Sequence, residues 1–515
     1  MKLICKWLSL CLFAAMLLTA FASCAKPKPE NPGSGAATNG TQSEQTREEV
    51  TTKVSALEQS GLEKKDFGGR KMKIWHGSGT VWSPYPMEVT LDEALTDIIY
   101  DGAYKRNTGL ERDLNIALQF VDSGTDPNTV GDNTNTDKKA LDMLWKSGDS
   151  ASYDMILAGG FASATLATEG FFLDLDNCKD VKPDADYYES RVNRQVRLMD
   201  HQYFASGFYS VTGTSGIEVI YVNTDIINSV NTDPDNPVST EILYEKALNK
   251  TWTVDYMLEL GSRYALDAGT NTGHYESDQY GTIFSYHSMH SVYHGLGGTD
   301  IVWNDASNRY NVVLSNQSNQ KIFEYIRENI TKKNGGEVLL SKRSPGAGVE
   351  EFLAKSAPFF WGGLNNIKEV IADGMHWTML PPPLFKEGND YNSFTSAWCL
   401  NFAGIPSNVT DSETSSYLYE MFMCYSYDYL YPAYYETCFQ LTYQPDSTSV
   451  RIFNLIARSR YVSMVNLYSL NNSGVEIKDI CRDTNLELGS SLKRASEVIA
   501  ANLTKLVENF SKKEQ

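Results

Sequence analysis

The sequence predicts an α/β fold in which short strands alternate with helices. In the first part of the ordered chain, apolar strands are expected at residues 71–77, 115–121 and 153–158. Helices are expected between them, at residues 91–110 and 138–146. Such alternation favours parallel βαβ units. The first expected strand ends in Gly77, and Gly159-Gly160 follows the third. The carboxyl ends of parallel strands are where such sheets bind ligands, so these glycines mark a candidate ligand-binding edge.

The same alternation continues through the rest of the chain. Residues 217–223 (IEVIYVN) form the next expected strand, and Trp252-Thr253-Val254-Asp255 begins a helix that runs to Leu266. Further helices are expected at residues 319–331, 349–353, 413–425 and 486–510. We find no repeat of solenoid period and no long apolar span after the N-terminal region. The ordered part, about 450 residues, is long enough for two large lobes.

The N-terminus is typical of a secretory signal. Lys2 and Lys6 precede an uncharged apolar run over residues 7–22, and the small residues Ala22-Ser23 lead to Cys24. This ending resembles the lipobox of bacterial lipoproteins, although Phe21 stands where that motif usually has Leu. The resemblance implies a signal peptide over residues 1–23 and a diacylglyceryl group on Cys24. The alternative is an uncleaved anchor helix, since the run approaches the roughly 20 residues that a span needs.

Residues 25–50 are rich in polar residues, Pro and Gly, which is typical of a flexible tether and favours the lipoprotein over the anchor helix. We place the lipidated cysteine and linker at residues 24–65. The formal net charge of −19 becomes about −21 without the signal and its two lysines. An acidic chain without a basic stripe is a poor partner for nucleic acid.

The cysteines indicate neither a disulfide scaffold nor a metal site. Two of the eight lie in the signal and Cys24 would be lipidated, and the remaining five are Cys178, Cys399, Cys424, Cys438 and Cys481. No pair has CxxC spacing. Because five is odd, at least one thiol is free or pairs between chains. A chain of this size does not need disulfides to fold.

Several segments, in order along nearly the whole mature chain, resemble the extracellular solute-binding proteins of family 1, the class that includes maltose-binding protein. The segments are Asp66-Phe67-Gly68-Gly69, Tyr104-Lys105-Arg106-Asn107, Tyr153-Asp154, Glu169-Gly170-Phe171-Phe172-Leu173-Asp174-Leu175, Ile220-Tyr221-Val222-Asn223, Trp252-Thr253, Asp278-Gln279-Tyr280-Gly281, Ala357-Pro358-Phe359-Phe360-Trp361-Gly362-Gly363, Ala403-Gly404-Ile405-Pro406 and Pro432-Ala433-Tyr434-Tyr435-Glu436.

The resemblance implies a type II periplasmic-binding-protein fold, with two α/β lobes joined by a hinge and a ligand cleft between them. The first lobe would take residues 66–213 with 394–431, and the second would take 214–393 with 432–515. The implied function is capture of a carbohydrate and its delivery to the permease subunits of an ABC importer. The protein would be a monomer without a cofactor, lipid-anchored on the outer face of the bacterial cytoplasmic membrane.

The abundance of aromatic residues, with 30 Tyr and 9 Trp, suits sugar binding. Indole and phenol rings bury the apolar C–H face of a pyranose, while polar side chains satisfy its hydroxyls. For each single aromatic residue, packing in the core remains the alternative. The candidate ligand-binding residues are Trp75, Trp82, Asp122, Phe161, Thr212, Thr214, Trp361, Trp398 and Tyr461.

Two segments carry metal-ligating residue types. On a helix, His287, His290 and His294 would share one face, but no acidic residue lies among them. The segment from Asp267 to Asp278 resembles a calcium loop, but it has Thr272 where an EF-hand needs glycine. We therefore interpret the first as a packed or exposed face and the second as a polar turn, and predict no metal.

Signatures of enzymes are missing: the sequence has no HExxH, no GxSxG and no Walker loop. Carboxylates are plentiful, so an enzyme that acts on polysaccharide at the cell surface remains an alternative. Capture of a peptide or another non-sugar solute is a further alternative, because the sequence does not determine the size of the cleft.

Overall fold

The computed structural model describes residues 54–77, 98–124, 133–209, 212–214, 216–229, 237–266, 279–342, 348–434, 447–471 and 475–511. They belong to one compact unit, Val54–Gln515. Cys24, Trp82, Cys438 and the segment from Asp267 to Asp278 lie outside the described residues. Among the helices that are described, none combines the length and the apolar character needed to cross a membrane.

The first sheet has the strand order β2, β1, β3, β12. Its strands are β1 (Arg70–His76), β2 (Ile116–Asp122), β3 (Met155–Gly159) and β12 (Asn401–Gly404). The predicted parallel units are confirmed, because β1 pairs in parallel with both β2 and β3. Strand β12 comes from far along the chain and pairs antiparallel with β3. The connecting helices, near the predicted positions, are α4 (Ile98–Leu114) and α5 (Asn133–Ser147), and α6 (Gly160–Thr168) follows β3.

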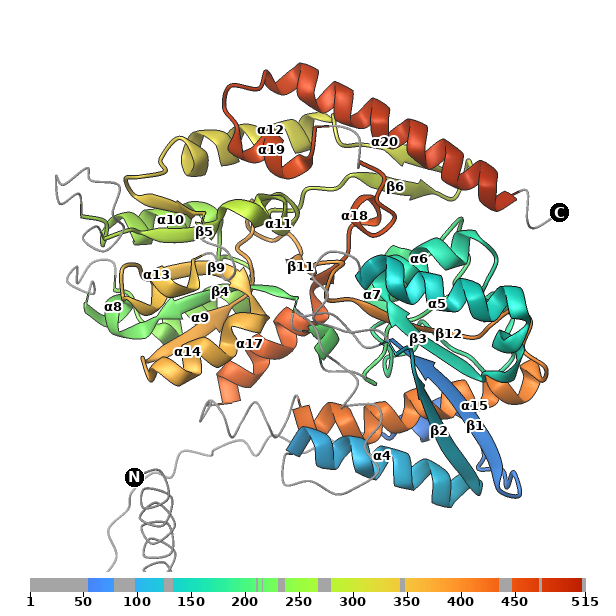
Figure 1. The fold of residues 1–515 in the computed structure, drawn as a ribbon. Coiled ribbons are helices and arrows are strands. Elements are labelled where there is room, and N and C mark those ends of the chain that lie inside the picture. The colour runs from blue at the N-terminus through green and yellow to red at the C-terminus, as the bar shows by residue number, and fades with distance from the viewer. Residues whose placement is uncertain are drawn as a thin grey trace, which may run out of the picture. The chain divides into compact units, whose positions relative to one another are not determined.

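The second sheet has the order β10, β4, β9, β5, β8, and Figure 1 labels its three central strands, β4, β9 and β5. Strand β5 pairs in parallel with β8 and β9, whereas β4 runs antiparallel to β9 and β10. All six side chains of β4 are buried, as expected for an interior strand covered on both faces. The strands are β4 (Glu218–Asn223), β5 (Thr282–Ser285), β8 (Val338–Ser341), β9 (Phe359–Gly363) and β10 (Trp377–Leu380).

Polar N-caps begin several of the remaining helices. The Thr253 hydroxyl accepts the Tyr256 N–H at the start of α10, and Asp411 accepts the Thr414 N–H at the start of α15. The remaining described α-helices are α2 (Ala56–Ser60), α7 (Ser190–Val196), α8 (Thr224–Ser229), α9 (Thr240–Leu248), α10 (Val254–Ser262), α11 (Met289–Gly295), α12 (Gln317–Ile326), α13 (Val349–Leu353), α14 (Ile367–Asp373), α15 (Ser412–Tyr425), α17 (Ser447–Arg458), α18 (Met464–Leu467), α19 (Ile477–Arg482) and α20 (Leu488–Ser511).

Three chain segments pair with one another between the two sheets, and the first two of them lead from one sheet to the other. The first precedes β4, where Ile217 forms a bridge with Thr395. The other two meet in a small parallel pair, β11 (Ser393–Phe394) with β13 (Arg460–Tyr461). We call the described residues 212–214 and 216–217, together with residues 393–400 and 460–463, the crossing segments. A hairpin of β6 (Ile301–Asn304) and β7 (Arg309–Val312) lies beside α20 (Figure 1).

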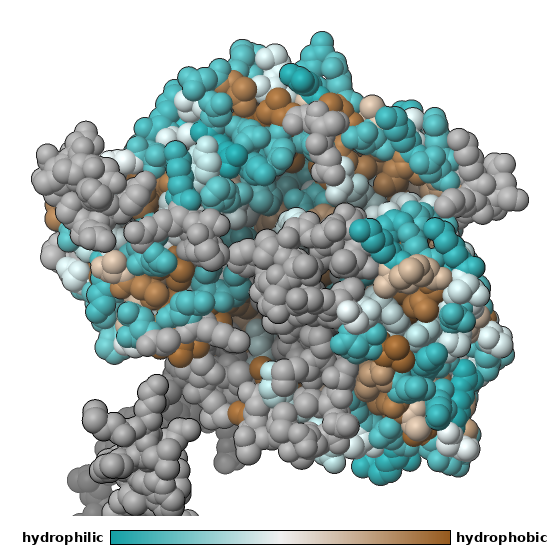
Figure 2. All heavy atoms as spheres, viewed as in Figure 1, coloured by the Kyte–Doolittle hydropathy of each residue, from teal (hydrophilic) through white to brown (hydrophobic). Residues whose placement is uncertain are grey.

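The apolar core forms separate clusters around the two sheets. Because side chains alternate along a strand, Met72 and Ile74 of β1 face one cluster and Trp75 faces another on the opposite side. The largest cluster encloses the second sheet and includes Trp252 and Trp361. On the face shown in Figure 2, hydrophilic residues dominate the described surface and hydrophobic residues form small, separate groups.

Candidate functional site

The carboxyl ends of three parallel strands meet at one edge of the first sheet. Strand β1 ends at His76 and is followed by Gly77, β2 ends at Asp122 and β3 ends at Gly159. We call this the carboxyl edge. The Asp122 side chain is exposed there, and one of its oxygens accepts the N–H of Gly124 at 2.8 Å. The backbone supplies polar groups at this edge and a carboxylate projects from it, as a site for a hydroxylated ligand requires.

Two of the predicted aromatic residues meet beside this edge. Phe161 is the second residue of α6, and its ring packs edge-on against Trp398 with the ring centroids 5.1 Å apart. Trp398 is 44% exposed, which is unusual for so large an apolar side chain. The Gly160 N–H donates to the Leu400 carbonyl at 2.8 Å, so the start of α6 is tied to the segment that carries Trp398. An indole fixed by a second ring offers a rigid apolar surface to a ligand.

A buried carboxyl group lies at the same edge. Asp137 of α5 is only 6% exposed, and its carboxyl group lies close to the backbone of Gly77 and Gly159. Burial raises the pKa of Asp137 to about 7, with a smaller contribution in the same direction from the charge of Asp122 and an opposing one from the Gly159 backbone. A β-carbon added to Gly77 would lie 2.2 Å from the nearer Asp137 oxygen, so any larger residue there would require the Asp137 carboxyl group to move. Asp137 was not among the predicted residues.

Two of the predicted tryptophans lie in the core. Trp75 of β1 is 2% exposed and packs in the cluster on one face of the first sheet. Trp361 of β9 is 1% exposed, and its ring lies against Phe284 and close to Gly295. The core alternative, left open for each aromatic residue, therefore describes both positions. Neither indole has an accessible face that a ligand could cover.

Two of the predicted polar residues, Thr212 and Thr214, lie in the first crossing segment. The Thr214 side chain is buried, and its hydroxyl donates to the Tyr434 hydroxyl at 3.1 Å. For Thr212 the structure describes the backbone, as part of a short 3-10 turn, but not the side chain. Glu218 follows this segment, and burial raises its pKa to about 8. One of its carboxyl oxygens is enclosed and has no hydrogen-bond partner in the described part of the chain.

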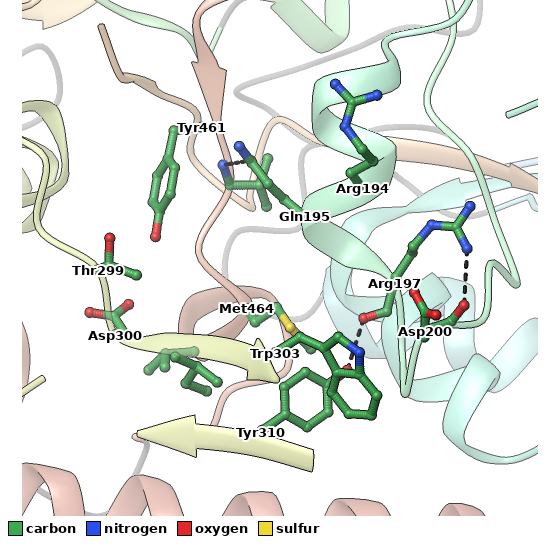
Figure 3. A pocket seen from close by; sticks show the side chains of 13 residues that line it. Arg194, Gln195, Arg197, Asp200, Thr299, Asp300, Trp303, Tyr310, Tyr461 and Met464 are labelled. Atoms are coloured by element: carbon green, nitrogen blue, oxygen red, sulfur yellow. Dashed lines mark hydrogen bonds between the residues drawn. The ribbon is translucent and has the colours of Figure 1, made fainter. Parts of the chain in front are cut away.

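Tyr461 lines a cavity of about 270 Å³ whose walls include neither Phe161 nor Trp398 (Figure 3). The cavity lies between α7, the β6–β7 hairpin and the crossing segment at β13. Its Tyr461 ring points toward Thr299 and Asp300, and Arg194 lies on the wall formed by α7 (Figure 3). Trp303 packs edge-on against Tyr310 with centroids 4.7 Å apart. Tyr461 thus belongs to a different surface from the Phe161–Trp398 pair.

The three clustered histidines occupy different environments. His287 is exposed, whereas His294 is buried and stacks on Phe394 with ring centroids 5.1 Å apart. The Nε2 atom of His294 lies 3.5 Å from an Asp300 oxygen. The edge of the His290 ring meets Phe394 as well. His290 and His294 thus pack inward from α11, whereas His287 lies in the 3-10 turn that precedes this helix, so the three do not share one helix face.

Within the described ranges, one group brings three potential metal-ligand atoms within 4.8 Å of one another: Asp174, Asp176 and His201. Arg197 already donates to both oxygens of Asp176, at 2.8 and 3.2 Å. The Nδ1 atom of His201 lies 2.8 Å from an Asp174 oxygen. These ion pairs and hydrogen bonds account for the cluster without a metal.

No protein-family model matches the sequence. No curated protein matches it either. Solved structures do match. UspC of M. tuberculosis is 15% identical, covers 84% of this chain and 100% of its own, and has a TM-score of 0.49. The ABC substrate-binding protein Lmo0181 from Listeria monocytogenes, in complex with cycloalternan, is 12% identical, with coverage of 85% and 99% and a TM-score of 0.46.

A cyclo/maltodextrin-binding protein complexed with maltotetraose is 10% identical, covers 86% of this chain and 98% of its own, and has a TM-score of 0.51. At this identity the likeness establishes the fold and nothing finer. The predicted fold class, an α/β periplasmic-binding-protein fold with two sheets, is thereby confirmed.

Proposed function

We propose that this protein captures a carbohydrate outside the cell and delivers it to the permease subunits of an ABC importer, without performing chemistry itself. The observation that carries the proposal is the exposed Trp398, fixed by Phe161 beside the carboxyl edge of the first sheet. A protein of the same fold binds maltotetraose, which supports a ligand of this class.

The pair of rings suits the chemistry of a sugar. The exposed face of Trp398 can cover the C–H face of a pyranose, and full burial of one large apolar side chain contributes about 1.5–3 kcal/mol. Asp122 offers an exposed carboxylate at the end of β2 that can accept hydrogen bonds from the hydroxyl groups of a sugar. Capture of a carbohydrate by this surface needs no nucleophile, metal or cofactor.

Delivery to an importer requires that the bound and free states differ. In our proposal, the crossing segments form a hinge, and a ligand that contacts both sheets favours a closed arrangement that the permease recognises. Glu218 and Thr214 lie where the first crossing segment joins the second sheet, and they are our candidates for a contribution from that side.

The proposed location follows from the N-terminal sequence. A diacylglyceryl group on Cys24 would hold the protein at the outer face of the bacterial cytoplasmic membrane, because two acyl chains retain a protein where one binds only marginally. The polar residues after Cys24 would let the folded unit reach the permease.

A thermal-shift screen tests the class of ligand. We expect oligosaccharides to raise the melting temperature of the full-length protein, and amino acids and peptides to leave it unchanged, because a ligand that binds only the native state stabilises it. Stabilisation by peptides alone would overturn the choice of ligand.

A surface enzyme is the second candidate, and one observation favours it. Asp137, with a pKa of about 7, lies close enough to Asp122 for that charge to affect its titration. A carboxylic acid with a raised pKa beside a second carboxyl group is an arrangement that glycosidases use. Chromatography of oligosaccharides after long incubation with the protein decides between the two: we expect intact sugars, and shortened products would establish the enzyme.

A further inference from the structure

The cavity of about 270 Å³ beside the β6–β7 hairpin grades from an exposed rim to a buried base. Arg194 and Asp200 are exposed and mark its rim, whereas Asp300 is 2% exposed and marks its base. Trp303 and Tyr461 are partly exposed. Every residue that lines this cavity belongs to the described part of the chain. Its volume is many times the roughly 30 Å³ that one water molecule occupies, so a small organic molecule fits inside.

The carboxyl group at the base uses only one of its two oxygens. The Oδ2 atom of Asp300 accepts the Ser463 hydroxyl at 2.7 Å and lies 3.5 Å from Nε2 of His294. The Oδ1 atom is enclosed and has no hydrogen-bond partner in the described residues. The hydroxyl of the neighbouring Tyr293 donates to the Thr299 carbonyl at 3.2 Å. A buried carboxyl oxygen without a donor is costly, so it calls for a donor from solvent or from a ligand.

The aromatic rings of the cavity are held in place by their neighbours. Trp303 packs edge-on against Tyr310, with the ring centroids 4.7 Å apart. The Tyr310 hydroxyl donates to the Arg197 carbonyl at 3.0 Å. The Tyr461 ring lies against His294, with centroids 5.1 Å apart. Rings that are already fixed lose little freedom when a ligand binds, and their faces attract a cation.

The positive side chains that line the cavity lie on the side away from Asp300 (Figure 3). They are Arg194 and Arg197. The Arg197 guanidinium is already paired with Asp176 at 2.8 Å and with Asp184 at 2.9 Å. Arg194 lies at the exposed rim, 3.7 Å from Asp184. The end of the cavity at Asp300 therefore offers a carboxyl group and aromatic faces, which suit a cation better than an anion.

We propose that this cavity is a second ligand site, and that it binds a small primary amine. The ammonium group donates to Oδ1 of Asp300, and the apolar body lies against the rings of Trp303 and Tyr461. An α-amino acid is disfavoured, because its own carboxylate would lie beside the ammonium group and close to Asp300. A peptide is too large for this volume. The site shares no residue with the surface formed by Phe161 and Trp398, so it does not rest on the proposed function.

The first test is a calorimetric titration of the full-length protein at pH 8 with phenethylamine, and with 2-phenylethanol as its neutral counterpart. We expect saturable binding of the amine, and an affinity for the alcohol that is about tenfold or more lower, because hydrogen bonds between charged groups are stronger. Trp303→Ala should lower the affinity for the amine about tenfold. Val302→Ala is the matched control, since Val302 is 40% exposed and points to the other face of β6.

A variant of the base tests the carboxyl group itself. Asp300→Asn keeps the shape of the side chain and an acceptor for Ser463 but removes the charge. We expect the preference for the amine over the alcohol to disappear. Ser463→Ala is the control, because it removes a partner of Asp300 and leaves the carboxyl group in place, so the preference should remain. If Asp300→Asn does not fold, the comparison of Trp303→Ala with Val302→Ala still decides.

A second test locates the amine. With 5-fluorotryptophan in the chain, the resonances of Trp303 and Trp398 can be assigned by their loss in Trp303→Phe and Trp398→Phe. We expect phenethylamine to shift the Trp303 resonance and to leave the Trp398 resonance unchanged. Under the proposed function, maltotetraose should do the reverse.

The outcomes separate this inference from the proposed function. A cavity that holds water alone would give no saturable binding of phenethylamine, which would overturn the inference and leave the function intact. Equal affinities for the amine and the alcohol, or a shift of the Trp398 resonance alone, would also overturn it. If phenethylamine binds and shifts the Trp303 resonance while maltotetraose does not bind, the inference holds and the proposed function is in question.

Discussion

Arg460 and Glu189 form a buried ion pair where the crossing segments meet, with their side chains 3% and 9% exposed. The same guanidinium donates to the Gly213 carbonyl at 3.0 Å and to the Thr395 hydroxyl at 3.4 Å. The second Glu189 oxygen accepts the hydroxyl of Ser206. One side chain thus joins all three crossing segments to the residue that precedes α7.

Replacing Arg460 by Met should destabilise the protein by about 3–5 kcal/mol, because it leaves the Glu189 charge buried without a partner. Denaturant titration measures the loss. The double variant Arg460→Met with Glu189→Gln removes that charge as well, so its loss should be smaller than the sum of the two single losses. Additive losses would show that the two groups do not interact.

The buried Glu218 should make stability depend on pH. Its pKa is raised from an ordinary value of 4.5 to about 8 by burial, so the native state favours the neutral acid. Its contribution is therefore present below about pH 4.5 and is lost progressively as the pH rises toward 8. Glu218→Gln should match the wild type at pH 5 and be more stable than it at pH 8.

Thermal unfolding at both pH values measures this difference. Glu337→Gln is the control, since Glu337 is half exposed and paired with Lys333 at the surface. A Glu218→Gln variant that is no more stable than the wild type at pH 8 would mean that the carboxyl group is ionised without cost.

Two glycines allow α10 to approach β5. A β-carbon on Gly261 would lie 2.7 Å from the Gly281 carbonyl oxygen, and one on Gly281 would lie 2.6 Å from the Gly261 carbonyl carbon. Because both contacts are with backbone, Gly261→Ala should cost about 1–3 kcal/mol. Gly489→Ala in α20, where the nearest atom is 3.4 Å away, should be neutral or stabilising by up to about 1 kcal/mol. Equal melting temperatures for the two variants would contradict this close packing.

The membrane anchor can be tested at one residue. We expect Cys24→Ser to release the protein into the medium while its affinity for ligand stays unchanged, because the thiol that would carry the lipid is lost. Fractionation of cells expressing each form measures the release. Retention of the variant at the membrane would instead support an uncleaved anchor helix.

Apolar periodicity predicted the elements better than it predicted their pairing. Strands β1, β2 and β3 and helices α15 and α20 lie within a few residues of their expected positions. The antiparallel pairing of β12 with β3, and of β4 with both of its neighbours, was not predictable. Those pairings join segments that lie far apart in the chain, and the local sequence of a strand does not determine which distant strand it pairs with.

The aromatic candidates show a similar limit. Trp361 lies in a strand and Trp398 follows one. Gly295 of α11 and Phe284 cover the Trp361 ring, whereas the Trp398 ring stays exposed. Which ring is covered depends on a helix from another part of the chain. Asp137 was missed because its signal, a carboxyl group set against glycines at the ends of two strands, becomes visible only when α5 is packed on the sheet.

The most direct test of the central claim is a calorimetric titration with maltotetraose and longer oligosaccharides at pH 8, comparing the wild type with Trp398→Ala. Trp303→Ala is the matched control, because that indole also packs edge-on against a neighbouring ring. We expect saturable binding by the wild type and the control, and a loss of affinity of about tenfold or more in Trp398→Ala. Unchanged affinity in Trp398→Ala, or no binding of any oligosaccharide by the wild type, would contradict the account.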